Sequence, residues 1–215
     1  MLATRILLIR HGQTDDNKNL VFQGQGGRGL NAEGRAECQR LAERLAGMGA
    51  KLDAIFCSDL TRARESAEIV AAPLGLSPVA DEGLREVYLG SWEGLAHQEI
   101  ASRFPEEWAA WQRGLDIRRG GGETYAELGD RMVAAVDRIA GGAHGGRLGI
   151  VSHGGTIKVF VARVLGVGVA SLRSFQVAAN TSVSVVERRE DGRYRLLVWN
   201  DVSHRGDALA EALGS

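Results

Sequence analysis

Continuous hydrophobic runs that are too short for typical helices predict the central strands of a buried sheet. Residues 5–9 and 148–151 are such runs, and residues 52–58 form a third stretch of the same kind. A parallel strand covered by helices on both faces is apolar at nearly every position, whereas a strand exposed on one face alternates. These segments therefore predict a parallel sheet buried between two layers of helices.

Apolar residues at helical spacing predict helices between and after these strands. Asn31 is a suitable N-cap for the first helix, and the glycines at 47 and 49 are expected to end it. Residues 13–29 are polar and rich in glycine, so a loop is expected there. The predicted helices cover residues 31–47, 59–74, 124–139 and 156–165.

The hydrophobic period changes in two other parts of the chain. Residues 181–186 and 193–199 alternate and flank a turn signal, so they predict an antiparallel hairpin, while residues 78–80 form a weak strand. Residues 87–122 contain three of the four tryptophans and a run of glycines, which indicates a small helical lid. The fold class is therefore α/β: a three-layer α/β/α sandwich with a mostly parallel mixed sheet, in a single domain over residues 1–215.

The composition is that of an ordinary globular protein. Hydrophobic residues make up 44%, charged residues 25%, and the formal net charge is -1, so the basic excess of nucleic-acid-binding proteins is absent. Cys38 and Cys57 have no metal-site or C-x-x-C spacing, which predicts reduced core residues in a cytoplasmic protein. No apolar stretch approaches the ~20 residues that cross a bilayer, so no membrane association is expected.

A histidine followed by glycine stands directly after each of two predicted strands. His11-Gly12 follows the first hydrophobic run, and His153-Gly154 follows the run at residues 148–151. Open α/β sheets bind ligands at the carboxyl ends of their strands, so we expect both imidazoles in one crevice. Glycine leaves the backbone N–H groups unhindered, which suits an anion such as phosphate.

Phosphoryl transfer from a monoester needs a nucleophile, cations around the phosphate oxygens and a proton for the leaving group. His11 is a suitable nucleophile once one ring nitrogen is held protonated and the other is free. Arg10 and Arg62 are candidates for holding the phosphate, and a protonated His153 would be a third cationic donor. Glu86, after the weak strand, is the candidate general acid.

Four separated motifs carry a family resemblance. They are Arg10-His11-Gly12, Ser58-Asp59-Leu60-x-Arg62-Ala63, Leu84-Arg85-Glu86 with Trp92-Glu93-Gly94, and Ser152-His153-Gly154-Gly155. In this order the chain resembles the histidine phosphatase superfamily, in its phosphoglycerate mutase-like branch. The resemblance implies a phosphohistidine on His11, a phosphate pocket from Arg10, Arg62 and His153 with help from Asn17, and Glu86 as acid and then base. It also implies that neither a metal nor another cofactor is needed.

Several further residues are candidates for substrate binding because of their place beside these motifs. They are Asn17, Gln23, Gly24, Gly154, and, in the lid, Tyr88 and Arg118. The residues of the motif around Glu86 resemble those of the phosphatase members, so hydrolysis of a small-molecule phosphate monoester is the predicted reaction. A phosphoglycerate mutase and a non-catalytic regulator that binds phosphate esters are the alternatives. A homodimer is a plausible assembly, because a mixed sheet has an exposed edge.

Overall fold

A six-stranded mixed sheet forms the centre of the computed structural model, which describes residues 3–143 and 145–206. The strand order is β3-β2-β4-β1-β5-β6, and the first four strands are mutually parallel. The C-terminal hairpin adds β5 antiparallel to β1 and β6 antiparallel to β5. The strands are β1 (Thr4–Arg10), β2 (Ala54–Cys57), β3 (Val79–Ala80), β4 (Arg147–Ser152), β5 (Val183–Arg188) and β6 (Tyr194–Asp201).

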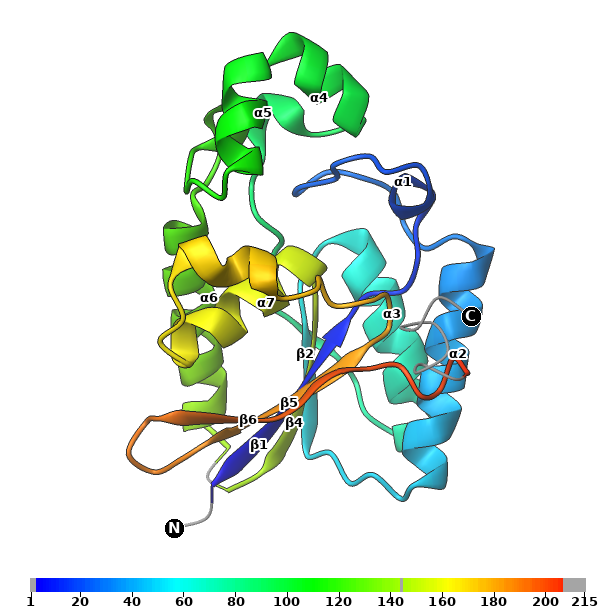
Figure 1. The fold of residues 1–215 in the computed structure, drawn as a ribbon. Coiled ribbons are helices and arrows are strands. Elements are labelled where there is room, and N and C mark those ends of the chain that lie inside the picture. Colours follow the sequence, from blue (N-terminus) through cyan, green and yellow to red (C-terminus); the bar gives the residue numbers. More distant parts are fainter. Residues whose placement is uncertain (1–2, 144, 207–215) are drawn as a thin grey trace.

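Helices cover both faces of this sheet (Figure 1). In β1, Ile6 and Leu8 pack in the core with α6 and α7, while Leu7 and Ile9 contact the core formed with α2 and α3. Because both faces are covered, the four central positions of the strand, residues 6–9, are all apolar, and the predicted three-layer α/β fold is confirmed. The covering helices are α2 (Ala32–Gly47), α3 (Thr61–Ala71), α6 (Tyr125–Gly141) and α7 (Gly154–Val164). No helix in the described part of the chain is both long and apolar enough to cross a membrane.

The segment predicted as a loop contains a short helix, α1 (Asp15–Lys18). Thr14 accepts a hydrogen bond from the Asn17 backbone, and the Asn17 side chain accepts one from the Thr14 backbone, which makes a capping box. The helix has no buried residue, so hydrophobic spacing gave no signal for it. Instead, the capping pair is the signal that the prediction missed, and it fixes the Asn17 side chain.

The lid, residues 87–122, carries α4 (His97–Arg103) and α5 (Pro105–Gln112) above the carboxyl ends of the strands (Figure 1). Its centre is Trp92, which is fully buried against Phe22 and the ring of Trp111. Main-chain hydrogen bonds join Phe22 to Leu95 and Gly94, so the lid is tied to the loop after β1. The lid and this loop therefore form opposite walls over the strand ends.

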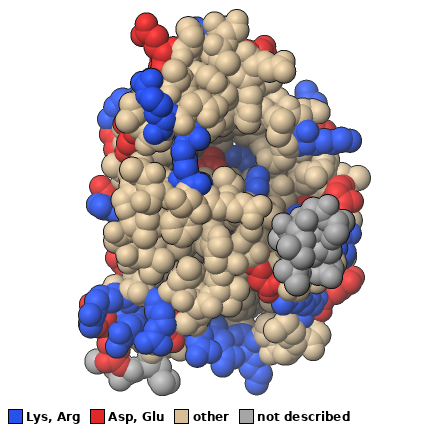
Figure 2. All heavy atoms as spheres, in the orientation of Figure 1, with Lys and Arg blue, Asp and Glu red and all other residues tan. Residues whose placement is uncertain are grey.

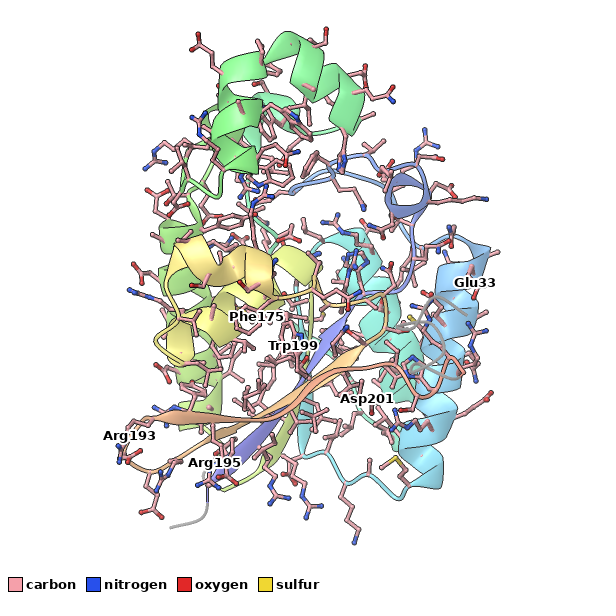
Figure 3. All side chains as sticks on the ribbon, viewed as in Figure 1. Glu33, Phe175, Arg193, Arg195, Trp199 and Asp201 are labelled. Carbon is pink, nitrogen blue, oxygen red and sulfur yellow. The ribbon has the colours of Figure 1, made fainter. Side chains whose placement is uncertain are left out.

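The segment before β5 returns to the same end of the sheet. Phe175 and Trp199 of β6 face each other with ring centroids 6.1 Å apart (Figure 3). Further along, the backbone N–H of Thr181 donates to the carbonyls of Arg10 and His11. These contacts place Ala178 and its neighbours beside the end of β1.

Candidate active site

Strand register brings the two predicted histidines together. β1 and β4 are adjacent and parallel, with Arg10 opposite Ser152, and the His11 N–H donates to the Ser152 carbonyl at 3.0 Å. His11 directly follows β1 and His153 directly follows β4, and their ring centroids lie 5.2 Å apart. The two imidazoles therefore share one crevice, as the two His-Gly pairs predict.

His11 is held in one tautomer by its own neighbour. Its Nδ1 lies 2.7 Å from the Gly12 carbonyl oxygen, which only accepts hydrogen bonds, so Nδ1 carries the proton and Nε2 has a free lone pair. The side chain is 3% exposed, and burial, followed by the charges of Arg62 and Arg10, holds its pKa well below 6.5. At neutral pH this imidazole is uncharged and suited to nucleophilic attack.

Two arginines reach the crevice from different elements. Arg62, in the first turn of α3 and 2% exposed, donates from its two Nη atoms to the carbonyls of Gly26 and Gly24, each at 2.7 Å. Arg10 donates from Nη1 to the Ala178 carbonyl at 2.6 Å. The Nε atoms of both arginines are buried without a hydrogen-bond partner. Each guanidinium is thus oriented by main chain and retains donor capacity for an anion.

His153 completes what we call the basic cluster: Arg10, His11, Arg62 and His153. It is fully buried at the N-cap of α7, and neither ring nitrogen has a hydrogen-bond partner among the residues that the structure describes. Burial and then the charge of Arg62 hold its pKa well below 6.5. A dianion in the crevice would oppose both causes, so ligand binding would favour protonation of His153.

Glu86 lies against the N-terminus of α7, with its carboxylate held at both oxygens. Oε2 accepts from the Gly155 N–H at 3.1 Å, and Oε1 accepts from the Thr156 hydroxyl at 2.8 Å and the Val87 N–H at 2.9 Å. Arg131 of α6 donates to the Glu86 carbonyl at 3.2 Å and so positions its backbone. The negative charge of Glu86 works against the lowering of the pKa of Arg10 and Arg62 by burial, so the carboxylate lies next to the basic cluster.

Arg10, His11, Arg62 and Glu86 line a cavity of about 200 Å³ beneath the lid, whereas His153 is fully buried and is not among its lining residues. Figure 2 shows the molecule hollowed in this region, with basic and acidic atoms inside. The predicted site residues that line the cavity are Arg10, His11, Asn17, Gln23, Gly24, Arg62 and Glu86. Asn17 is oriented by the Asn180 side chain, which donates to its Oδ1 at 3.2 Å, and the Gln23 Oε1 is buried without a partner.

Three predicted substrate contacts are not among the lining residues. Tyr88 is 47% exposed, and the Arg118 side chain pairs with Glu127 outside the cavity, so the structure does not bring either to the basic cluster. Gly154 begins α7, where a Cβ would lie 2.8 Å from Val177 and 3.1 Å from the Arg10 Nε. Its missing side chain therefore makes room for Arg10, whereas Gly155 lines the cavity.

Arg119, the residue next to Arg118, occupies the place that was predicted for Arg118. Arg119 is 2% exposed, lines the cavity and donates to the Tyr125 hydroxyl at 3.0 Å, with its guanidinium 4.1 Å from the centre of that ring. Its Nη2 is buried without a partner. Two adjacent arginines look alike in sequence, and only the turn at residues 119–121 decides which one points inward.

Asn180 also has a place in the site that sequence reasoning missed. Its side chain donates to the His11 carbonyl at 3.0 Å as well as to Asn17. An asparagine before a strand is common in loops, so no sequence signal marked it. In the described ranges, no group of three or more His, Cys, Asp or Glu side chains is arranged to hold a metal ion.

A neutral histidine with a free Nε2, basic groups around it and a carboxylate beside it define a site for phosphoryl chemistry on histidine. The chain belongs to the histidine phosphatase superfamily (branch 1), whose family model matches residues 6–202. This finding confirms the resemblance carried by the four motifs.

Two plant proteins are among its relatives. Phosphoglycerate mutase-like protein 4 of Arabidopsis thaliana is 38% identical over 93% of this chain and 86% of its own length. The metal-independent phosphoserine phosphatase of the same plant is 35% identical over 94% of this chain and 83% of its own length.

Solved structures share the fold. Bacillus stearothermophilus YhfR is 34% identical, with a TM-score of 0.87 over 94% of this chain and 99% of that one. A mycobacterial glucosyl-3-phosphoglycerate phosphatase in complex with VO3 is 31% identical, with a TM-score of 0.82 over 91% of this chain and 98% of its own.

Proposed function

We propose that the protein hydrolyses small-molecule phosphate monoesters through a phosphohistidine on His11. The observation that carries the proposal is the hydrogen bond from Nδ1 to the Gly12 carbonyl, which leaves Nε2 unprotonated inside the basic cluster. Names of relatives support it, because a phosphoserine phosphatase and glucosyl-3-phosphoglycerate phosphatases are among them.

In the first step, the His11 Nε2 attacks phosphorus while the ester P–O bond breaks on the opposite side. Arg10, Arg62 and a protonated His153 neutralise the charge on the three equatorial oxygens. The Glu86 carboxyl gives its proton to the departing alkoxide, so the alcohol leaves neutral. The products of this step are the free alcohol and phosphohistidine.

In the second step, a water molecule takes the place of the alcohol. Glu86, now a carboxylate, removes a proton from this water as its oxygen attacks phosphorus and the N–P bond breaks. Inorganic phosphate leaves, and His11 and Glu86 return to their initial states. The Gly155 N–H and the Thr156 hydroxyl orient the carboxylate for both transfers.

A mutase would use the same phosphohistidine and return the phosphoryl group to a phosphoglycerate instead of to water. One relative is named phosphoglycerate mutase-like, so this is the second candidate. Release of inorganic phosphate and interconversion of phosphoglycerate isomers are measured on the same preparation. Isomerisation faster than phosphate release would favour the mutase.

The test of the phosphohistidine is chemical. The protein is mixed briefly with a radiolabelled phosphate monoester, denatured, and divided between acid and base. Label that is lost in acid and retained in base is expected on the unaltered protein and absent from His11→Ala. Binding of phosphate esters without label or phosphate release would instead indicate a non-catalytic regulator and contradict the proposal.

We also propose a single domain over residues 1–215, with the lid at about 87–122, that works in the cytoplasm without nucleic acid. Buried, unpaired Cys38 and Cys57 support a reducing compartment. A homodimer through the sheet edge is supported by β6, where Leu197 and Val198 are exposed. Sedimentation at two protein concentrations tests this assembly.

A further inference from the structure

A second cavity of about 310 Å³ adjoins the first. Trp111, Tyr125 and Val177 line both cavities, so they form a common wall. The first cavity is lined by Arg10, His11 and Arg62 of the basic cluster, which would bind the phosphate group, and by Glu86. The second therefore lies where the alcohol part of a phosphate ester would extend from the reacting phosphorus.

Most of the second cavity is lined by apolar side chains. Leu172 is buried in its wall, while Leu115 and Val177 are 50% and 47% exposed near it. Exposed large apolar side chains around a hollow are typical of ligand-binding surfaces. The body of the ligand is expected to be hydrophobic or aromatic.

Lys158 gives this cavity a charge. It lies on α7 three residues after Gly155, so it is about one helical turn from the N–H that holds Glu86. The side chain is half-buried and, in the described part of the chain, makes no hydrogen bond or ion pair. Burial, followed by the nearby charge of Arg173, lowers its pKa.

Arg173 cannot serve as the partner of Lys158, because both are cations. Its Nη2 donates to the Trp111 carbonyl at 2.9 Å and to the Gln112 side chain at 3.2 Å. The guanidinium thus fixes the end of α5 and adds positive potential to the cavity. In the described ranges, this half-buried ammonium therefore has a second cation beside it and no bonded anion that would stabilise it.

We infer that the second cavity binds the alcohol part of the substrate, a hydrophobic or aromatic group that carries a carboxylate, and that Lys158 pairs with this carboxylate. The inference rests on the proposed function and names its substrate class: phosphate monoesters of hydroxy acids. An alcohol that carries an ammonium group in the same place would be repelled by Lys158 and Arg173.

The experiment compares two esters with the same phenolic leaving group. One is the phosphate ester of para-hydroxyphenylpropanoate, and the other is its carboxyl methyl ester, which is neutral at the far end. We expect kcat/KM for the acid to exceed that for the methyl ester by about tenfold or more, the range of a hydrogen bond to a charged group. The difference should decrease as salt is added.

Lys158 variants test the residue itself. Lys158→Met should bring the ratio of the two kcat/KM values to about one, and Lys158→Glu should instead favour the matching phosphate ester with a propylammonium chain. A reversed preference cannot come from a structural defect alone. Lys51→Met, which removes an exposed lysine before β2, is the matched control and should leave the ratio unchanged.

Each outcome bears on one claim or both. A ratio near one in the unaltered protein, or a ratio that survives Lys158→Met, overturns the inference while phosphate release upholds the proposed function. Absence of phosphate release and of phosphohistidine with both esters overturns the proposed function, and the inference with it.

Discussion

The basic cluster and the lid meet at the same cavity but are held in different ways. In the basic cluster, Arg10, His11 and Arg62 hydrogen-bond to main-chain carbonyls. At the lid, Arg118 donates to the Gly122 carbonyl but also pairs with the side chain of Glu127, and Arg119 donates to the Tyr125 hydroxyl. Substitution of a neighbour can remove a side-chain partner, whereas a main-chain carbonyl is present whatever the residue.

This difference indicates that the basic cluster determines the chemical reaction and the lid determines substrate selectivity. A basic cluster oriented by the main chain keeps its geometry while the surrounding sequence changes. A lid whose arginines depend partly on side-chain partners can change its contacts by single substitutions. We therefore expect replacements in the basic cluster to act on turnover and replacements in the lid to act on substrate preference.

The largest effect is expected from removal of the nucleophile. His11→Ala should lower kcat by about 10⁴-fold or more, because no other group in the cavity would form the covalent intermediate. Phosphate release is followed with a phosphate monoester, and circular dichroism checks that the variant is folded. Turnover near that of the unaltered protein would remove His11 from the mechanism.

The next effect concerns the general acid. Glu86→Gln retains the side-chain shape but cannot give a proton, so it should lose about 10² to 10⁴-fold with alkyl phosphates. The loss should be much smaller with nitrophenyl phosphate, whose leaving group needs little protonation. Equal losses with both substrates would assign Glu86 a role in binding rather than in proton transfer.

Replacement of a lid arginine that lines the cavity should have an effect of intermediate size, and its neighbour in the sequence provides a matched control variant. Arg119→Met should raise KM by about tenfold to a hundredfold, the range for a lost hydrogen bond to a charged group. Arg118→Met, one residue away and paired outside the cavity, should change KM by less than about twofold. Steady-state kinetics of the two variants test this assignment, and similar KM values would contradict it.

The smallest effect concerns stability and comes from the buried histidines. Folding lowers the pKa values of His11 and His153. Below about pH 6.5, these two histidines therefore become protonated in the unfolded chain while they stay neutral in the folded chain. The free energy of unfolding should therefore decrease with falling pH, by at most about 1.4 kcal/mol per pH unit for each histidine.

Urea unfolding at about pH 6.5 and pH 5.5 measures this slope. His153→Gln should reduce it, and saturating sulfate, which remains a dianion over this pH range, should also reduce it because a dianion favours protonated His153. A slope that neither change affects would assign the pH dependence to other groups.

Sequence reasoning predicted that the two histidines lie together, because their positions depend on a simple rule. Parallel strands end at the same edge of a sheet, so residues that directly follow two such strands lie together. His11 and His153 follow this rule, and Arg62 and Glu86 were predicted from their places shortly after the second strand and the weak strand. The helix at residues 15–18 was not predicted, because it buries no apolar residue.

The α/β fold, the buried strands and the two histidines at their ends could be read from the amino-acid sequence, since these follow from local hydrophobic pattern and pairing. Packing in three dimensions was needed to show that Arg119 rather than Arg118 faces the cavity, that Asn180 supports His11, and that Lys158 has no partner among the described residues beside the site. Loop direction and side-chain partners depend on packing between segments far apart in the chain, and no local pattern encodes such contacts.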